Sequence, residues 1–253
     1  MTNAATLQIT DAQREQFREE GYFILERALP DTSVQTLRDE CQRFIDRTNA
    51  EMDRQGVDVL GINHRDNRYF IPHPSQESPA IREILFSDVF APICHATLGD
   101  DAWVYWEQYV VKAAEIGMKF SWHQDSAFGQ AAPHKPYVSC WCALDDVSEE
   151  NGTVYVLPYS RAGTREVVPH VKEEGTNDLV GYSGDDQGEI VEIPSGGIAV
   201  FSSTNLHRSG VNTTDQMRRV YLAQFSGELI QNKDGSGPFG RAEPLLQDGR
   251  RVG

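Results

Sequence analysis

Apolar and polar positions in the first hundred residues recur mainly with the period of a helix. Capping residues at Thr10 or Asp11 and a stop at Gly21 predict a short helix through "AQREQFREEG". A second helix is predicted from a cap at Asp31, because apolar-facing positions then recur at steps of three and four: Val34, Leu37, Cys41, Phe44, Ile45 and Thr48. The same spacing predicts a third helix over residues 79–98.

Two stretches of this region lack the helical period. The apolar run "YFILERALP" (residues 22–30) predicts a strand after the first helix. Residues 57–78 show little periodicity of any kind and are predicted to form a loop.

From Asp100 the pattern changes to short aromatic and β-branched runs separated by Gly, Pro, Asn and Asp. These runs predict strands over residues 103–111, 137–144, 153–158, 189–194, 197–203 and 219–226. Because no helical pattern intervenes, the short strands favour an antiparallel sandwich or barrel.

Together these patterns predict one α+β domain, mainly β, over residues 1–253. Its parts are a helical segment (1–100), a β core (101–226) and a polar, Gly-rich tail (227–253) that is expected to be irregular. A length of 253 residues with 39% hydrophobic content suits one domain of generous size.

Charge and composition narrow the possible partners. The net charge is −15 and no Lys/Arg run occurs, so the chain is expected to repel nucleic acid and anionic membrane surfaces. There is no apolar run long enough for a membrane span, and the N-terminus lacks the pattern of a signal peptide, so a cytoplasmic location is expected. The cysteines follow no CxxC pattern and are predicted to be buried thiols: Cys41, Cys94, Cys140 and Cys142.

Candidate chemistry begins with His123 and Asp125 in "FSWHQDSAFG". In an extended chain, residues i and i+2 point to the same face, so both side chains can face one metal ion while Gln124 turns away. An imidazole and a carboxylate are two ligands of the 2-His-1-carboxylate site of non-haem Fe(II) enzymes. The pair alone is weak evidence, because such triplets also occur at ordinary polar strand ends.

His207 is the best candidate for the third ligand, since it follows the strand-like "GGIAVFSSTNL" late in the β region. Ser209 stands two residues later and Arg218 eleven residues later. An arginine here suits 2-oxoglutarate, because the distal carboxylate of that co-substrate needs a charged partner when it is buried. Arg218 and Arg219 face opposite sides of a strand, and alternation alone leaves the choice between them open.

Four segments resemble the phytanoyl-CoA dioxygenase family of Fe(II)/2-oxoglutarate oxygenases: "WHQD" (122–125), "WCALDDVSEENGTVYVLPYSR" (141–161), "PSGGIAVFSSTNLHRSGVN" (194–212) and "RRVYLAQF" (218–225). With the N-terminal "GYFILERALP", the resemblance spans nearly the whole chain. It implies a double-stranded β-helix, a cupin-like jelly roll, with N-terminal helices packed on one side. "LPYSR" departs from the family's usual "PGSH", which leaves the shape of that loop open.

The resemblance also implies the roles of individual residues. The family's iron ligands fall on His123, Asp125 and His207. Its 2-oxoglutarate arginine falls on Arg218, and the positions that line the co-substrate pocket fall on Ser209 and Trp141.

The implied cofactors are Fe(II), 2-oxoglutarate and O2, and the implied activity is hydroxylation of a small molecule with release of succinate and CO2. Asp125 favours oxygen transfer over halogenation, because halogenating relatives lack this carboxylate. Desaturation, epoxidation or cyclisation would use the same ligands. By position, Arg68, Gln108 and Phe128 are the candidates for contact with the substrate.

Two other classes of protein share parts of this pattern. A cupin-type iron enzyme that works without 2-oxoglutarate would not need Arg218. A non-catalytic jelly roll that binds a small ligand would leave His123, Asp125 and His207 too far apart to share a metal. No feature of the sequence predicts an oligomeric state.

Overall fold

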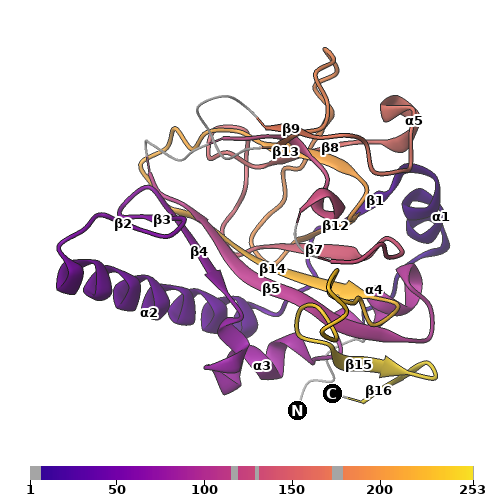
Figure 1. The fold of residues 1–253 in the computed structure, drawn as a ribbon, viewed down its shortest axis with the longest axis horizontal. Coiled ribbons are helices and arrows are strands. Elements are labelled where there is room, and N and C mark those ends of the chain that lie inside the picture. The colour runs from indigo at the N-terminus through magenta and orange to yellow at the C-terminus, as the bar shows by residue number, and fades with distance from the viewer. Residues whose placement is uncertain (1–6, 115–118, 129–130, 173–178, 253) are drawn as a thin grey trace.

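The computed structural model describes residues 7–114, 119–128, 131–172 and 179–252. Two antiparallel β-sheets face each other, and helices cover the outer face of the larger sheet (Figure 1). Side chains from both sheets meet in one apolar cluster, in which Trp141 and Ala199 of the larger sheet pack with Val154 and Val156 of the smaller one. This confirms the predicted α+β, mainly β jelly roll.

The larger sheet supplies one wall of the sandwich. Its strands run in the order β1 (Tyr22–Leu25), β12 (Ile198–Ser202), β7 (Val138–Ala143), β14 (Arg218–Ser226), β5 (Ala102–Lys112), β4 (Arg68–Pro72), β3 (Asn63–His64) and β2 (Val59–Leu60). The strands β7, β12 and β14 are buried almost throughout, since one face meets the smaller sheet and the other meets the helices.

The smaller sheet carries the opposite wall. Its order is β11 (Glu189–Ile190), β8 (Val154–Leu157), β13 (Leu206–Ser209) and β6 (Phe120–His123). A separate pair of short strands, β9 (Val171–Lys172) and β10 (Leu179–Val180), lies beside β6. Only two residues of the predicted strand 189–194 pair as a strand.

The first two predicted helices form as expected. α1 (Asp11–Glu20) begins with a capping box on Thr10 and ends at Gly21, which adopts a left-handed conformation. α2 (Asp31–Gln55) starts one residue earlier than predicted, since its cap is Pro30, and its buried stripe packs against the larger sheet. In Figure 1, α2 runs beneath β4 and β5.

The third predicted helix is two helices, α3 (Pro79–Leu85) and α4 (Phe90–Thr97). The break lies at Ser87, whose hydroxyl accepts a hydrogen bond from the backbone of Val89 and so competes with the helical pattern. The unexpected "LPYSR" loop forms a short helix, α5 (Tyr159–Ala162).

The description of residues 1–100 as helical was incomplete, and that of residues 227–253 as irregular was wrong in part. The predicted strand after α1 joins the larger sheet as β1. The expected loop 57–78 supplies β2, β3, β4 and a 3-10 turn, η1 (Pro74–Gln76), and the tail supplies β15 (Glu243–Gln247) and β16 (Arg250–Arg251). These strands are short and pair with residues distant in sequence, so they leave little local periodicity.

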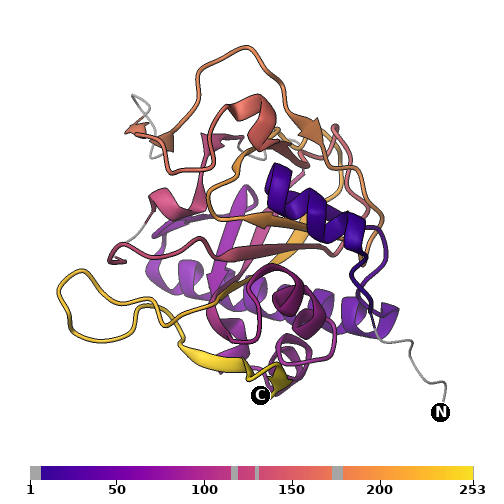
Figure 2. The same cartoon turned by 90° about the vertical axis from the view of Figure 1, so that its right-hand side faces the viewer.

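The C-terminal segment closes one end of the sandwich. Figure 2 shows the chain between β14 and β15 as a long loop at this end, and β15 then pairs with the start of β5. All four cysteines are buried and unpaired, as predicted. In the described part of the chain, no helix combines the length and apolar character that a membrane crossing requires.

Candidate metal centre

His123 and His207 come together because their strands pair. They are direct cross-strand partners in the antiparallel ladder of β6 and β13, and their ring centroids lie 4.2 Å apart. After Gln124 the chain enters a 3-10 turn, η2 (Asp125–Ala127), which brings the carboxylate of Asp125 toward both rings. The one-residue spacing of His123 and Asp125 therefore converges as the sequence predicted.

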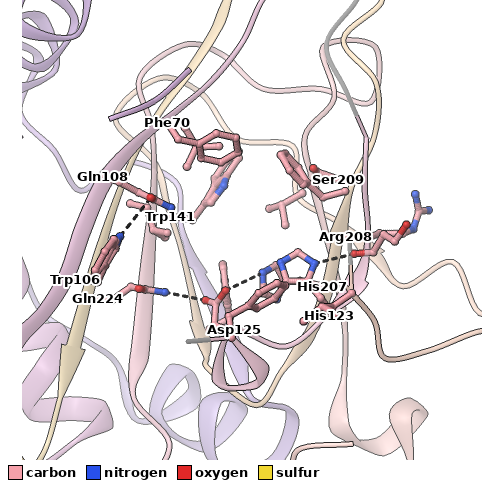
Figure 3. Close-up of a pocket in the computed structure, with 18 of the residues that line it drawn as sticks. Phe70, Trp106, Gln108, His123, Asp125, Trp141, His207, Arg208, Ser209 and Gln224 are labelled. Atoms are coloured by element: carbon pink, nitrogen blue, oxygen red, sulfur yellow. Dashed lines mark hydrogen bonds and ion pairs between the residues drawn. The ribbon is translucent and has the colours of Figure 1, made fainter. Parts of the chain in front are cut away.

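The three side chains form a compact cluster of ligand atoms. One nitrogen or oxygen from each of His123, Asp125 and His207 lies within 4.8 Å of the others, and no other such group of three occurs among the described residues. Figure 3 shows the three side chains pointing toward one another inside the cavity. The Nε2 atom of His207 lies 3.5 Å from Oδ1 of Asp125.

Backbone carbonyls fix the orientation of both imidazoles. Nδ1 of His123 lies 2.7 Å from the carbonyl oxygen of Ser121, and Nδ1 of His207 lies 3.0 Å from that of Asn205. A carbonyl only accepts, so each Nδ1 carries the proton and each Nε2 keeps a lone pair for a metal. Burial, followed by the neighbouring His207, lowers the pKa of His123 to about 3, which keeps this ring neutral.

Asp125 is held in a similar way. Its Oδ2 atom accepts hydrogen bonds from the Ser139 hydroxyl (2.6 Å) and from Nε2 of Gln224 (2.9 Å), while Oδ1 faces His207. Two neutral imidazoles and one oriented carboxylate fit a non-haem Fe(II) site, since the donor types are right and each donor has an outer partner. Sequence reasoning missed Ser139 and Gln224, because their approach depends on the register of β7 and β14.

Gln124 turns away from the cluster, as expected. Its side-chain amide donates to the carbonyl oxygens of Glu166 (2.9 Å) and Thr204 (2.5 Å), and its carbonyl accepts from the backbone of Val168. The residue thus anchors the segment that follows α5 against the loop that carries the proposed ligands.

Arg218 faces the interior, whereas Arg219 faces outward and pairs with Asp145. Arg218 is only 1% exposed, and its Nε and Nη1 atoms have no hydrogen-bond partner within the described chain; Nη2 makes one long contact of 3.4 Å to the carbonyl of Gly152. Burial lowers the pKa of this guanidinium to about 10. A buried, largely unpaired guanidinium fits a ligand carboxylate.

The neighbours of Arg218 complete a polar corner. Its guanidinium carbon lies 5.4 Å from the ring centroid of Trp141. Ser209 accepts a hydrogen bond of 2.9 Å from Nζ of Lys112, the cross-strand partner of Arg218. Lys112 was not predicted; a lysine at the end of an apolar aromatic strand was the signal in the sequence.

The cluster and this corner open into one cavity of about 500 Å³ between the two sheets. The three candidates for substrate contact, Arg68, Gln108 and Phe128, lie on its wall together with Trp141 and Ser209. Gln108 accepts a hydrogen bond of 3.3 Å from the indole of Trp106, and Phe128 packs edge-on against His123.

Two imidazoles and one carboxylate on one side of a jelly-roll cavity define the class of non-haem Fe(II) oxygenases. The family model of phytanoyl-CoA dioxygenase (PhyH) matches residues 17–220, and the chain belongs to this family. The protein is thus a non-haem iron enzyme, a 2-oxoglutarate-dependent dioxygenase that uses Fe(II), 2-oxoglutarate and O2.

Known proteins resemble this chain over most of its length. The chain is 26% identical to phytanoyl-CoA dioxygenase domain-containing protein 1 of Danio rerio, over 84% of this chain and 88% of that protein. Among solved structures it is similar to SnoK, a non-haem alpha-ketoglutarate-dependent carbocyclase of nogalamycin biosynthesis (TM-score 0.70, 18% identity, 95% of each chain). It is also similar to EvdO2 of Micromonospora carbonacea var. aurantiaca complexed with 2-oxoglutarate (TM-score 0.66, 23% identity, 95% of this chain and 96% of that one).

Proposed function

We propose that the protein hydroxylates a small molecule, and that His123, Asp125 and His207 hold the Fe(II) that this reaction needs. The observation that carries the proposal is the convergence of these donors within 4.8 Å, each oriented by a partner outside the cluster. Binding through one face of the ion leaves the remaining positions open for co-substrate and O2.

Arg218 is the proposed partner of the distal carboxylate of 2-oxoglutarate. Its unpaired Nε and Nη1 atoms offer donors in a fixed plane, and a carboxylate there would relieve the burial of an uncompensated charge. Ser209 and Trp141 border the same space and are proposed to contact the co-substrate along its length.

In the overall reaction, the substrate, 2-oxoglutarate and O2 yield the hydroxylated product, succinate and CO2. When bound, Fe(II) and 2-oxoglutarate supply the activation of O2 and the oxidation of the substrate C–H bond. The chain supplies position and a cavity that excludes water, with Arg68, Gln108 and Phe128 as proposed substrate contacts. Desaturation, epoxidation or cyclisation would use the same ligand set.

The proposed location is the cytoplasm. The four buried, unpaired cysteines are compatible with a reducing compartment. Fractionation of the source cells with an antibody against the protein tests this, and recovery from an organelle or from the medium would contradict it.

The function is tested by adding Fe(II) and then 2-oxoglutarate to the protein without O2. The expected result is a weak visible charge-transfer band in the wild type that His207→Ala abolishes. His95→Ala is the matched control, since His95 lies half-exposed on α4 outside the cavity. A wild type without the band, or a normal band in His207→Ala, would contradict the proposal.

A further inference from the structure

A β-bulge adds an extra aromatic side chain to the cavity wall beside the metal cluster. In the ladder of β14 and β5, Gln224 pairs with Trp106 while the next residue, Phe225, pairs with Val104. Tyr105 is the extra residue, so both Tyr105 and Trp106 line the cavity although they are consecutive. Bulges next to active sites commonly turn a side chain in this way.

Three other segments add aromatic rings at the same place. Tyr137 precedes β7 and lies 4.5 Å from Tyr105 between ring centroids; Phe239, from the loop between β14 and β15, lies 5.8 Å from Tyr105. Phe128 packs on His123, with 5.4 Å between ring centroids, and is 43% exposed at the cavity wall. These four rings and Trp106 form what we call the aromatic half of the cavity.

The hydroxyl groups of Tyr105 and Tyr137 are donors without acceptors. Both residues are buried as a whole and line the cavity, and neither hydroxyl has a hydrogen-bond partner within the described chain. Neither oxygen is among the fully enclosed polar atoms of that part of the chain, so both hydroxyls reach the cavity space. Burial and then the charge of Asp125 raise the pKa of Tyr105 to about 12, and the same two causes raise that of Tyr137 well above its usual value. A tyrosine hydroxyl is protonated at neutral pH, so both groups can donate a hydrogen bond. A ligand in the cavity can therefore provide an acceptor for each hydroxyl.

Charge is concentrated at the opposite end of the cavity. Arg218, Lys112 and Arg68 are successive cross-strand neighbours on β14, β5 and β4. Gln224, which bonds Asp125, lies six residues further along β14, a distance of about 20 Å along the backbone.

Arg208 also borders the cavity, but its guanidinium stacks on Tyr155 at 3.8 Å and points away from the cluster in Figure 3.

We propose that the substrate is a neutral, flat, largely apolar molecule with a hydrogen-bond acceptor, which the aromatic half holds while Tyr105 and Tyr137 donate to that acceptor. This rests on the proposed function, because it assumes that the reacting carbon lies beside the metal cluster. The rings supply apolar contact area, and the two hydroxyls fix the orientation of the molecule. Tyr105 and Tyr137 are thus specificity-determining residues.

The same observations disfavour a charged substrate such as an acyl-CoA. Among the described residues that line the cavity, Asp125 is the charged residue next to the aromatic half. Arg218 and Arg68 lie at the opposite end of the cavity, and the guanidinium of Arg208 stacks on Tyr155. A phosphate buried among the rings would have no cation to pair with, and an ammonium group would meet a carboxylate that the metal already neutralises. The net charge of −15 adds repulsion against a polyanion.

The test compares 9-fluorenone with fluorene, which has the same ring system but lacks the carbonyl acceptor. Dissociation constants are measured by equilibrium dialysis without O2, on the protein loaded with Fe(II) and 2-oxoglutarate, for the wild type and for Tyr105→Phe/Tyr137→Phe. Comparing the ratio of the two constants between the wild type and the double variant cancels the difference in hydrophobicity between the probes. We expect the preference for fluorenone to fall about tenfold in the double variant, the effect of one well-placed hydrogen bond, while fluorene binding stays the same.

Tyr155→Phe is the matched control, because the Tyr155 hydroxyl bonds Glu149 and the ring does not line the cavity. It should keep the wild-type preference. An equal preference in the wild type and the double variant, no binding of either probe, or octanoyl-CoA binding as tightly as fluorenone would overturn the proposal. Failure of the proposed function has a separate signature, loss of the Fe(II)/2-oxoglutarate band, which does not depend on either probe.

Discussion

At the scale of single residues, Arg218 is the residue on which the proposed 2-oxoglutarate site chiefly rests. It is a buried cation, and two of its side-chain nitrogens have no partner among the residues that the structure describes, which is costly in the ligand-free protein. Such a cost is retained where a ligand compensates it. Arg219, its neighbour in sequence, has its own partner in Asp145 and serves as an internal comparison.

Replacing Arg218 by leucine should weaken 2-oxoglutarate binding about 100-fold, because a buried charged hydrogen-bond partner is lost. The ligand-free variant should be as stable as the wild type or more stable, since an uncompensated charge has been removed. Arg219→Leu should keep the affinity although it loses a salt bridge. Calorimetric titration with 2-oxoglutarate checks both, and equal affinities in the two variants would contradict the assignment.

Ser139 offers a milder test of the metal cluster. Its hydroxyl orients Asp125 from behind, and loss of such an outer partner commonly costs 10- to 100-fold in metal affinity, a range of about one to two orders of magnitude. Ser139→Ala should therefore weaken Fe(II) binding by about this factor in a competition titration with a chelator. Ser226→Ala, at another buried serine of the larger sheet, should leave the affinity unchanged.

How much of the site could be predicted depended on how far apart in the sequence the interacting residues lie. His123 and Asp125 were predictable together because strand alternation is a local property. Strand alternation places Arg218 and Arg219 on opposite faces of a strand but does not say which face is buried. The choice of Arg218 therefore needed the resemblance to a known family. Ser139 and Gln224 approach Asp125 only through the register of β7 and β14, and no single-sequence pattern encodes that register.

At the scale of elements, the C-terminal segment is tied to β5 by a buried ion pair. Glu107 is fully buried and bonds the Tyr221 hydroxyl and Arg241, whose side chain is 2% exposed. Arg241 stands between Phe239 in the cavity and the strand β15, so this pair holds the tail against the end of the sandwich. The tail looked irregular in sequence because this anchor is a contact across more than a hundred residues.

Arg241→Ala should lower the free energy of unfolding by about 3 kcal/mol, because Glu107 is left buried without its cation. Urea denaturation measures the change. Arg250→Ala, at an exposed position of β16, should have an effect near zero. Equal effects of the two substitutions would show that the buried pair does not anchor the tail.

At the scale of the whole molecule, two sheets form a cavity that is cationic at one end, metal-binding by proposal in the middle and aromatic at the other end. The sequence predicted the strands of the β core and the strand β1, but not the other strands that the first hundred residues add to the larger sheet. Those strands, such as β4 against β5, form because they pair with a strand that is distant in sequence. Short edge strands have little internal pattern of their own.

Because both ligands are proposed to bind in one cavity, we expect the metal and the co-substrate to stabilise the fold cooperatively. Mn(II), which resists oxidation, and 2-oxoglutarate together should raise the melting temperature by about 5 °C or more at concentrations 100-fold above their dissociation constants. Either ligand alone should give a smaller shift, because one of the two buried sites then stays uncompensated. A thermal shift assay checks this, and purely additive shifts would contradict it.

The central claim, that His123, Asp125 and His207 share one iron, is tested most directly by X-ray absorption at the Fe K-edge. The protein is loaded anaerobically with one Fe(II) per chain and with 2-oxoglutarate. The predicted spectrum contains the scattering of two imidazoles per iron, falling to one in His207→Ala samples that still retain metal. Fewer than two imidazoles in the wild type, or an unchanged spectrum in the variant, would contradict the claim.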